Sequence, residues 1–368
     1  MTRAFLSQEA AARYSQARID TIRALGHLAE EHQARFMLVA GDVFESNQLS
    51  AQTLSRALDA LNSVPVPVFL LPGNHDPLDA SSIFRSNAFR EQARGHIIVV
   101  ENSEPIPVPG LANVEVVGAP WFSKRPGVDL CAQALKSLEP APGVTRILLG
   151  HGQVDSLSPD HSQPGVISQA LLEQALAEGR VHYVALGDRH SLTEVGASGR
   201  LCYSGTPLVT DFDEVEPNEA LLVELDSDAC RLTPLATGFW EFQALQRHFD
   251  GPEDLAGFAQ WLDAVRGKEC TVLKVGFTGS VNLALAAQLD ALLEAQAPLF
   301  ASLKRRERTT DLAVIPDALD DNAIALSGYA DATWKALLAR AATDDTATDA
   351  LRLMYRLAGG ANIKGRGA

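Results

Sequence analysis

Four short clusters of polar residues carry the side chains of this sequence that could do chemistry. Each cluster follows an apolar run, and together they contain carboxylates, an amide and imidazoles. The clusters are Gly41-Asp42, Gly73-Asn74-His75-Asp76, Gly150-His151 and Gly187-Asp188-Arg189-His190. Because the carboxyl ends of parallel strands meet at one edge of a sheet, we expect these side chains to converge there.

The donor types in the clusters suit a divalent metal site. Carboxylate, amide and imidazole groups together are typical ligands of Mn²⁺, Fe²⁺ or Zn²⁺, and one carboxylate can bridge two ions. Two ions about 3.5–4 Å apart can hold a phosphate and a hydroxide for in-line attack. The pattern therefore predicts a two-metal hydrolytic site. The alternative is four unrelated turns, since Gly-Asp and Gly-His occur in many loops.

Helix and strand patterns alternate along the part of the chain that holds the clusters. The spacing of apolar residues predicts an amphipathic helix over residues 8–33 and a second helix after Ser50. Apolar runs predict strands at residues 36–40, 68–71, 97–100, 114–117, 147–149 and 183–186. This alternation is typical of an α/β fold with parallel strands.

The composition of the sequence changes after about Thr237. The following segment is rich in aromatic residues and then shows a strand pattern over residues 271–277 and two further helix patterns. The chain of 368 residues is long enough for two domains. We predict one domain at residues 1–237 and a smaller α/β domain at residues 238–368, with a disordered tail from about Gly359.

Composition and charge exclude several classes of protein. The chain is 46% hydrophobic and 21% charged, and it has no apolar run approaching the ~18 residues of a membrane span. Its four cysteines (Cys131, Cys202, Cys230 and Cys270) lack CxxC spacing, so we expect free thiols in a cytoplasmic protein. The net charge of −15 argues mildly against a protein that coats nucleic acid by itself.

The ordered clusters resemble the calcineurin-like metallophosphoesterase superfamily. Flanking residues are similar to those of SbcD-type DNA repair exonucleases and their YhaO-like relatives. These runs are Ala40-Gly41-Asp42-Val43-Phe44, Leu71-Pro72-Gly73-Asn74-His75-Asp76, Tyr183-Val184-Ala185-Leu186-Gly187-Asp188 and Tyr203-Ser204-Gly205-Thr206-Pro207. The resemblance covers residues 1–237 and implies a four-layer αββα sandwich, to which the family usually adds a small C-terminal capping domain.

The resemblance also implies a role for the residues of the clusters. Asp42 would bridge two divalent ions, for which Mn²⁺ is expected. Asn74 and His151 would complete the shell of one ion, and His190 would bind the other. Relatives often have a histidine at the position of Asp188, where a carboxylate can still coordinate the metal.

The activity implied by the resemblance is a metal-dependent phosphodiesterase that acts on DNA, as a 3′→5′ exonuclease or an end-processing nuclease. His75 would lie just outside the metals, polarise the scissile phosphate and protonate the leaving oxygen. The implied partner is an SbcC-like coiled-coil ATPase, and a homodimer is compatible with it. The alternatives are a small-substrate phosphatase or cyclic-nucleotide phosphodiesterase, and a non-catalytic scaffold subunit.

The chain departs from the family pattern before Asp42. Relatives open with a strand that ends in Asp-x-His or a similar pair and supplies two ligands to the metal that His190 serves. Nothing before Asp42 fits, because Asp20, His27 and His32 lie within the first predicted helix. Either the start codon is placed too far downstream, or the protein lacks this strand and is a degenerate member. The first explanation is favoured, since a missing central strand would expose backbone hydrogen-bonding groups.

Overall fold

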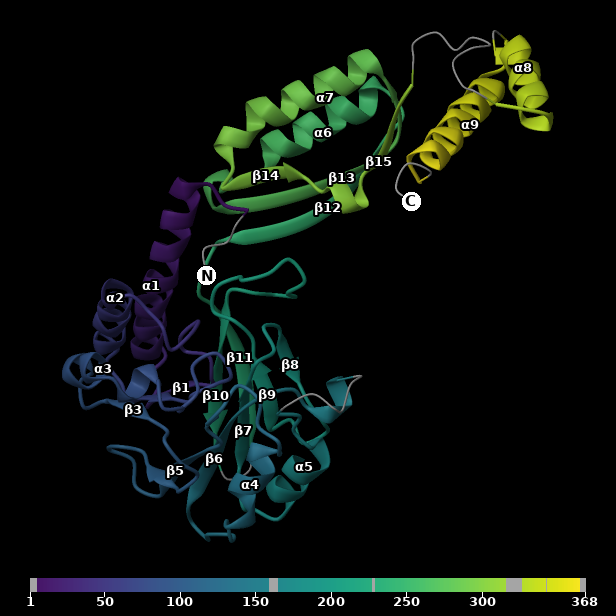
Figure 1. The fold of residues 1–368 in the computed structure, drawn as a ribbon. Helices are drawn as coiled ribbons and strands as arrows, with labels where there is room; N and C mark the ends of the chain where they lie inside the picture. The colour runs from purple at the N-terminus through teal and green to yellow at the C-terminus, as the bar shows by residue number, and fades with distance from the viewer. Residues whose placement is uncertain (1–4, 159–164, 227–228, 316–325, 342, 365–368) are drawn as a thin grey trace. The chain divides into compact units, whose positions relative to one another are not determined.

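The computed structural model of the protein describes residues 5–158, 165–226, 229–315, 326–341 and 343–364 (Figure 1). The described chain divides into two compact units, one of residues 11–240 and one of residues 5–10 and 241–364. The sequence places the whole N-terminus in the first domain, but residues 5–10 group with the second unit. The ring of Phe5 packs edge to face on Phe242 at 5.5 Å, and its carbonyl oxygen accepts a hydrogen bond from Ser302.

Three helices cover the outer face of a parallel three-stranded sheet in the first unit (Figure 1). The helices are α1 (Gln8–Glu31), α2 (Ala51–Asn62) and α3 (Asn87–Gln92). The strands, in sheet order, are β1 (Met37–Val39), β2 (Val68–Leu70) and β3 (Ile97–Val99). Leu54, Leu58 and Leu61 of α2 recur every three to four residues, so they form one apolar face of that helix, which packs on the sheet.

A six-stranded sheet forms the next layer, with α4 (Leu130–Lys136) and α5 (Gln169–Ala177) on its outer face. Its order is β4-β5-β6-β7-β9-β8, with parallel pairing from β5 to β9 and an antiparallel strand at each end. The strands are β4 (Ile106–Pro107), β5 (Val114–Gly118), β6 (Thr145–His151), β7 (Tyr183–Gly187), β8 (Leu192–Glu194) and β9 (Leu201–Ser204).

The inner faces of the two sheets pack on each other. Phe69 and Leu71 from the three-stranded sheet contact Val116 and Leu149 from the six-stranded sheet, and all four side chains are buried. The order of layers is therefore helix, sheet, sheet, helix, and the predicted αββα sandwich is confirmed. An antiparallel hairpin of β10 (Glu219–Leu225) and β11 (Cys230–Ala236) packs against the same six-stranded sheet.

The second unit is also α/β. Its parallel sheet has the order β12-β13-β14, and β15 pairs with a further part of β13. These strands are β12 (Glu241–Phe249), β13 (Thr271–Asn282), β14 (Ser302–Arg305) and β15 (Asp311–Ile315). Helices α6 (Pro252–Ala264) and α7 (Leu283–Gln296) bury their apolar residues on one face of this sheet.

Two helices, α8 (Tyr329–Ala341) and α9 (Asp345–Lys364), end the described chain. The sequence predicts disorder from Gly359, but α9 continues to Lys364, and residues 365–368 lie outside the described part. Each residue added to an existing helix gains a hydrogen bond, so a helix can extend across two glycines that cost about 1 kcal/mol each. Short 3-10 turns lie at residues 83–85, 155–157, 268–270, 297–299 and 307–309. None of the helices described has the length and apolar character needed to cross a membrane.

Candidate metal centre

The ends of four strands bring predicted site residues together in the first unit. Asp42 follows β1, Asn74 follows β2, His151 ends β6 and Asp188 follows β7. The Nε2 atom of His151 lies 2.9 Å from the side-chain amide of Asn74, 3.4 Å from Asp42 Oδ2 and 3.7 Å from Asp188 Oδ1. Residues far apart in sequence therefore come into contact at the carboxyl edge of the two sheets.

The backbone adopts unusual conformations where it presents the two carboxylates. Asp42 has φ of 51° and Asp188 has φ of 96°, and Gly41 has φ of 91°. A residue other than glycine in such a region costs about 1–3 kcal/mol, and such residues cluster at functional sites. The fold thus holds both aspartates in conformations that a simple turn would avoid.

Two glycines let the backbones of neighbouring loops approach each other. A Cβ atom at Gly73 would overlap the carboxylate of Asp42, and one at Gly187 would overlap the carbonyl oxygen of Ala40. The glycines before Asn74 and before Asp188 therefore have a steric role, which is to allow close packing of the strand ends.

Replacing Gly187 with alanine should therefore displace the loop that carries Asp188. We expect a loss of about 1–3 kcal/mol in the free energy of unfolding, since the new methyl group meets a backbone carbonyl that cannot move freely. Gly95→Ala is the matched control, because no atom lies within 4 Å of the place that its Cβ would occupy. Thermal unfolding followed by circular dichroism measures both variants, and equal melting temperatures for the two would contradict the steric argument.

The tautomer of His151 is set by its surroundings. Its Nδ1 atom lies 2.8 Å from the carbonyl oxygen of Ala40, so Nδ1–H donates there and the Nε2 lone pair faces Asp42 and Asn74. The imidazole ring is buried, packs edge to face on Trp121 at 5.7 Å, and has its own carbonyl bonded by the indole N–H of that residue. This is the orientation that a metal-binding histidine requires.

The side-chain amide of Asn74 lies among three electron-rich atoms. In the orientation that satisfies its neighbours, the amide nitrogen is 2.9 Å from His151 Nε2 and 3.1 and 3.2 Å from the two oxygens of Asp42. The two N–H bonds of this group are therefore shared among three acceptors. A cation would satisfy these lone pairs together, and with the amide turned over the oxygen of Asn74 would be a further ligand.

The charges at this point favour a positive group. Burial opposes ionisation of Asp42, but a His151 that carries a second proton, on Nε2, would be charged and would hydrogen-bond to this carboxylate; this effect outweighs burial and lowers the pKa of Asp42. Burial likewise disfavours the imidazolium, but Asp42 and Asp188 outweigh it and raise the pKa of His151. Burial and the charge of Asp42 raise the pKa of Asp188. Either a proton on His151 or a divalent cation can supply the positive charge that the two carboxylates attract.

His75 lies at the rim of this cluster. Its backbone N–H donates to Asp42 Oδ1 at 2.9 Å, whereas its side chain is 45% exposed. Its ring Nδ1 is 3.2 Å from the carbonyl oxygen of Glu45, and its Nε2 is 3.9 Å from Asp42 Oδ2. The ring is therefore next to the carboxylate and open to solvent, where it can exchange protons.

Asp76 fixes the loop that carries Asn74 and His75, a role that sequence reasoning did not assign. Its side chain is fully buried and accepts the backbone N–H groups of Gly73 and Phe44, each at 2.8 Å. These bonds tie the loop after β2 to the loop after β1. Burial raises the pKa of Asp76 to about 6. The signal in the sequence was a carboxylate three residues after a turn glycine, a spacing at which it can bond back to the backbone.

His190 bonds to a carboxylate outside this cluster, that of Glu214. Its Nδ1 is 2.8 Å from Glu214 Oε1 and 2.8 Å from Thr210 Oγ1. The hydrogen bond to Glu214 raises the pKa of His190, with smaller contributions from the charges of Asp188 and Asp42. The charge of Asp42 thus acts on both His151 and His190. Sequence reasoning gave Glu214 no function.

The donor chemistry fits a divalent metal, although the side chains face one another. In the described part of the chain, no group of three or more His, Cys, Asp or Glu residues is already arranged around a common point as a metal site. Two carboxylates, an amide and an imidazole with a free Nε2 nevertheless lie in contact, which is the donor set expected for Mn²⁺, Fe²⁺ or Zn²⁺. Asp42, Asn74, His151 and Asp188 would hold such an ion.

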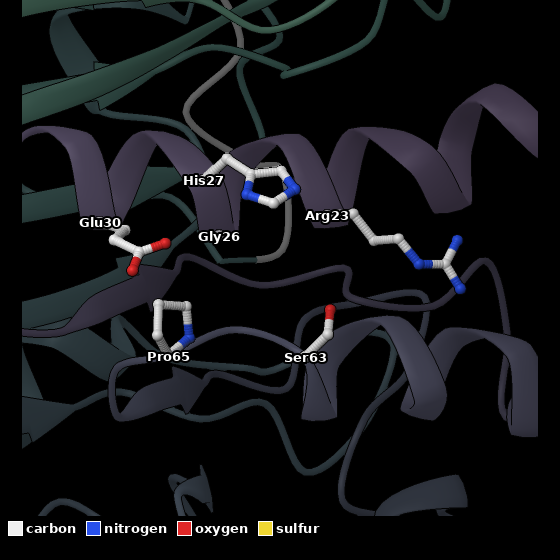
Figure 2. Close-up of a pocket in the computed structure, with 6 residues that line it drawn as sticks. All are labelled: Arg23, Gly26, His27, Glu30, Ser63 and Pro65. Carbon is white, nitrogen blue, oxygen red and sulfur yellow. The ribbon is translucent and has the colours of Figure 1, made fainter.

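A separate cavity of about 200 Å³ lies between α1 and the segment that leads into β2 (Figure 2). It is lined by Arg23, Gly26, His27, Glu30, Ser63 and Pro65. Ser63 and Pro65 precede β2, whereas Asn74 follows it, so the cavity lies at the opposite end of this strand from the candidate centre. The guanidinium of Arg23 already pairs with Asp20 and Asp59. This cavity is not part of the centre.

Comparison with known proteins agrees with the geometry. Residues 15–192 match the family model for calcineurin-like phosphoesterases, and this range contains Asp42, Asn74, His151, Asp188 and His190. The match supports a calcineurin-like phosphoesterase domain and, in general, a metal-dependent phosphoesterase.

Two solved structures are similar over a comparable length. One is described as the crystal structure of TT1561 of Thermus thermophilus; it is 10% identical, with 59% of this chain and 94% of that chain covered and a TM-score of 0.39. The other is 15% identical, with 59% and 95% covered and a TM-score of 0.38. Both TM-scores are below 0.5, so no conclusion about the site or its chemistry rests on either likeness.

Proposed function

We propose that the calcineurin-like phosphoesterase domain of this protein hydrolyses phosphodiester bonds of DNA at a two-metal centre around Asp42. One observation carries the proposal: two carboxylates and an amide from three strand ends lie within 3.7 Å of His151 Nε2. Asp42, with Asn74, His151 and Asp188, would hold one ion. His190 would bind the second, with Asp42 between them. Mn²⁺ suits this mixture of oxygen and nitrogen donors.

The metal ions, His75 and Asp42 would have different roles in the reaction. Divalent ions supply polarisation of the phosphate and a water of lowered pKa. His75 would act as the general acid from the rim. In the imidazolium form, Nδ1–H would donate to the Glu45 carbonyl and the second proton, on Nε2, would pass to the leaving oxygen. The carboxylate of Asp42, 3.9 Å from Nε2, would attract the charged imidazolium.

The choice of DNA as substrate rests on the runs that resemble SbcD-type and YhaO-like exonucleases. The net charge of −15 fits a nuclease whose partner supplies the basic surface, and we propose an SbcC-like coiled-coil ATPase as that partner. The second unit would serve as the capping domain. The four cysteines are free thiols, as is usual in the reducing cytoplasm, where we place the protein.

The proposed activity is tested with end-labelled linear DNA and purified protein in Mn²⁺. We expect hydrolysis of DNA that EDTA abolishes and that an Asp42→Ala preparation lacks, which excludes a contaminating nuclease. The same protein is assayed with p-nitrophenyl phosphate and a cyclic nucleotide. Turnover of these small esters without cleavage of DNA would replace the nuclease by a phosphatase. No Mn²⁺-stimulated hydrolysis of any of these substrates would indicate a scaffold subunit.

A further inference from the structure

We infer that Glu214 is the positioning residue of His190, an inference that rests on the proposed function. The two side chains form a hydrogen bond between Glu214 Oε1 and His190 Nδ1, 2.8 Å long. The side chain of Glu214 is 5% exposed, whereas that of His190 is 53% exposed. The buried carboxylate of Glu214 therefore accepts a hydrogen bond from one ring nitrogen of His190, whose side chain is otherwise about half exposed to solvent.

Glu214 is itself fixed by the segment after β9. The backbone N–H of Thr210 donates to its Oε2 at 2.8 Å, and the hydroxyl of Thr210 donates to its Oε1. Both oxygens of Glu214 thus act as acceptors, one for a backbone N–H and one for a hydroxyl, which makes this side chain a fixed partner for an imidazole N–H.

This bond determines which nitrogen of His190 is available. With Nδ1–H donated to Glu214, the lone pair is on Nε2. The carbonyl of Ala40 does the same for His151 at 2.8 Å, so both imidazoles are held in the same tautomer. The two histidines differ in the group that accepts their Nδ1–H. For the buried His151 it is a neutral backbone carbonyl, and for the exposed His190 it is a charged carboxylate. A carboxylate on the far nitrogen also makes the free nitrogen a stronger metal ligand.

The backbone around His190 is fixed from the same loop. The N–H of Thr206 donates to the carbonyl oxygen of His190 at 3.0 Å. The N–H of Val215 donates to the hydroxyl of Ser191, the next residue along the chain, at 2.9 Å. The loop of residues 204–216 therefore holds His190 at its ring through Glu214 and at its main chain through Thr206. We assign this loop the function of presenting one imidazole nitrogen to the second ion.

The test compares Glu214→Gln and Glu214→Ala with Glu216→Gln, a change at an exposed glutamate of the same loop. Long-range ¹H–¹⁵N spectra of the full chain without added metal report the tautomer of His190, assigned with a His190→Gln sample. Titration calorimetry with Mn²⁺ alone reports affinity. We expect Nδ1–H in the wild type and in Glu216→Gln, a mixture of tautomers in Glu214→Ala, and a loss of Mn²⁺ affinity of about 10–100-fold in Glu214→Ala.

The outcomes separate this inference from the proposed function. An unchanged His190 tautomer in Glu214→Ala, with Mn²⁺ affinity equal to that of Glu216→Gln, would overturn the positioning role. A changed tautomer in a protein that binds no Mn²⁺ would support the positioning role and contradict the proposed metal centre. If Glu214→Ala unfolds, Glu214→Gln is used instead, because glutamine keeps the shape of the side chain and one acceptor oxygen. Its Mn²⁺ affinity is then expected to lie between that of the wild type and the background.

Discussion

Asp42→Ala is expected to reduce bound divalent metal to background and to lower kcat by about 10³-fold or more, the scale seen when a main electrostatic stabiliser is removed. The carboxylate of Asp42 lies next to His151 Nε2 at 3.4 Å, accepts the backbone N–H of His75 at 2.9 Å, and faces the amide of Asn74. It therefore links the ends of three strands, and no neighbouring carboxylate can take over all three contacts. Metal content is measured by mass spectrometry after gel filtration.

The control for this variant is Asp59→Ala, which removes an exposed aspartate on α2 that pairs with Arg23. We expect it to keep its metal and its activity. Because Asp42 has a positive φ that alanine adopts at some cost, Asp42→Asn serves as a second variant that tolerates this backbone. Wild-type metal content in both Asp42 variants, with unchanged melting temperatures, would remove Asp42 as the bridging ligand.

His75→Ala is expected to lose turnover while it keeps its metal. The side chain of His75 is at the rim, with its Nε2 3.9 Å from Asp42 Oδ2, and the hydrogen bond of its ring goes to the Glu45 carbonyl. A general acid contributes about 10²–10⁴-fold to the rate, so kcat should fall by that factor. Single-turnover assays with end-labelled DNA and metal analysis of the same preparation give the two quantities.

The role of His75 follows from comparing the turnover rate of His75→Ala with its metal content. His27→Ala is a suitable control, since this histidine lies on α1 beside the separate cavity of Figure 2. It should match the wild type in rate and in metal content. Loss of metal together with turnover in His75→Ala would show that His75 is a ligand, and full retention of turnover would show that the proton comes from elsewhere.

The sequence was informative where a short apolar run ends in a polar residue. Asp42, Asn74, His151 and Asp188 each follow such a run, and parallel pairing of the strands places their carboxyl ends at one edge. The last residues of each strand are read directly from the sequence, and the alternation of helix and strand patterns favours parallel pairing. The two layers of helices around the sheets were implied by the resemblance to the phosphoesterase family.

The partners of the polar residues were not predictable in the same way. Glu214 reaches His190 across 24 residues of loop and strand, and Asp76 reaches the N–H of Phe44 across 32 residues. Such contacts depend on how irregular loops fold over one another, which hydrophobic periodicity does not describe. The hydrogen bond of His190 to Glu214 depends on the same loops.

In the second unit, the sequence contained signals for the start of a helix, but these signals lie among a group of aromatic residues. Helix α6 begins with Pro252 after Gly251, and Asp254 accepts the N–H of Gly251 at 3.0 Å, a typical start of a helix. Neither this helix nor β12 is among the elements that we predicted. Phe249 and Phe258 face the same core from the strand and from the helix, so the aromatic residues reflect packing between two elements.

Electron paramagnetic resonance of Mn²⁺ titrated into the full chain tests the central claim most directly, since free and protein-bound Mn²⁺ give different signals. We predict that the wild-type protein depletes the signal of aqueous Mn²⁺, that the bound ion shows coupling to imidazole nitrogen, and that His151→Gln weakens this binding. An aqueous Mn²⁺ signal unchanged by excess wild-type protein would contradict the claim that Asp42, Asn74, His151 and Asp188 form a metal centre.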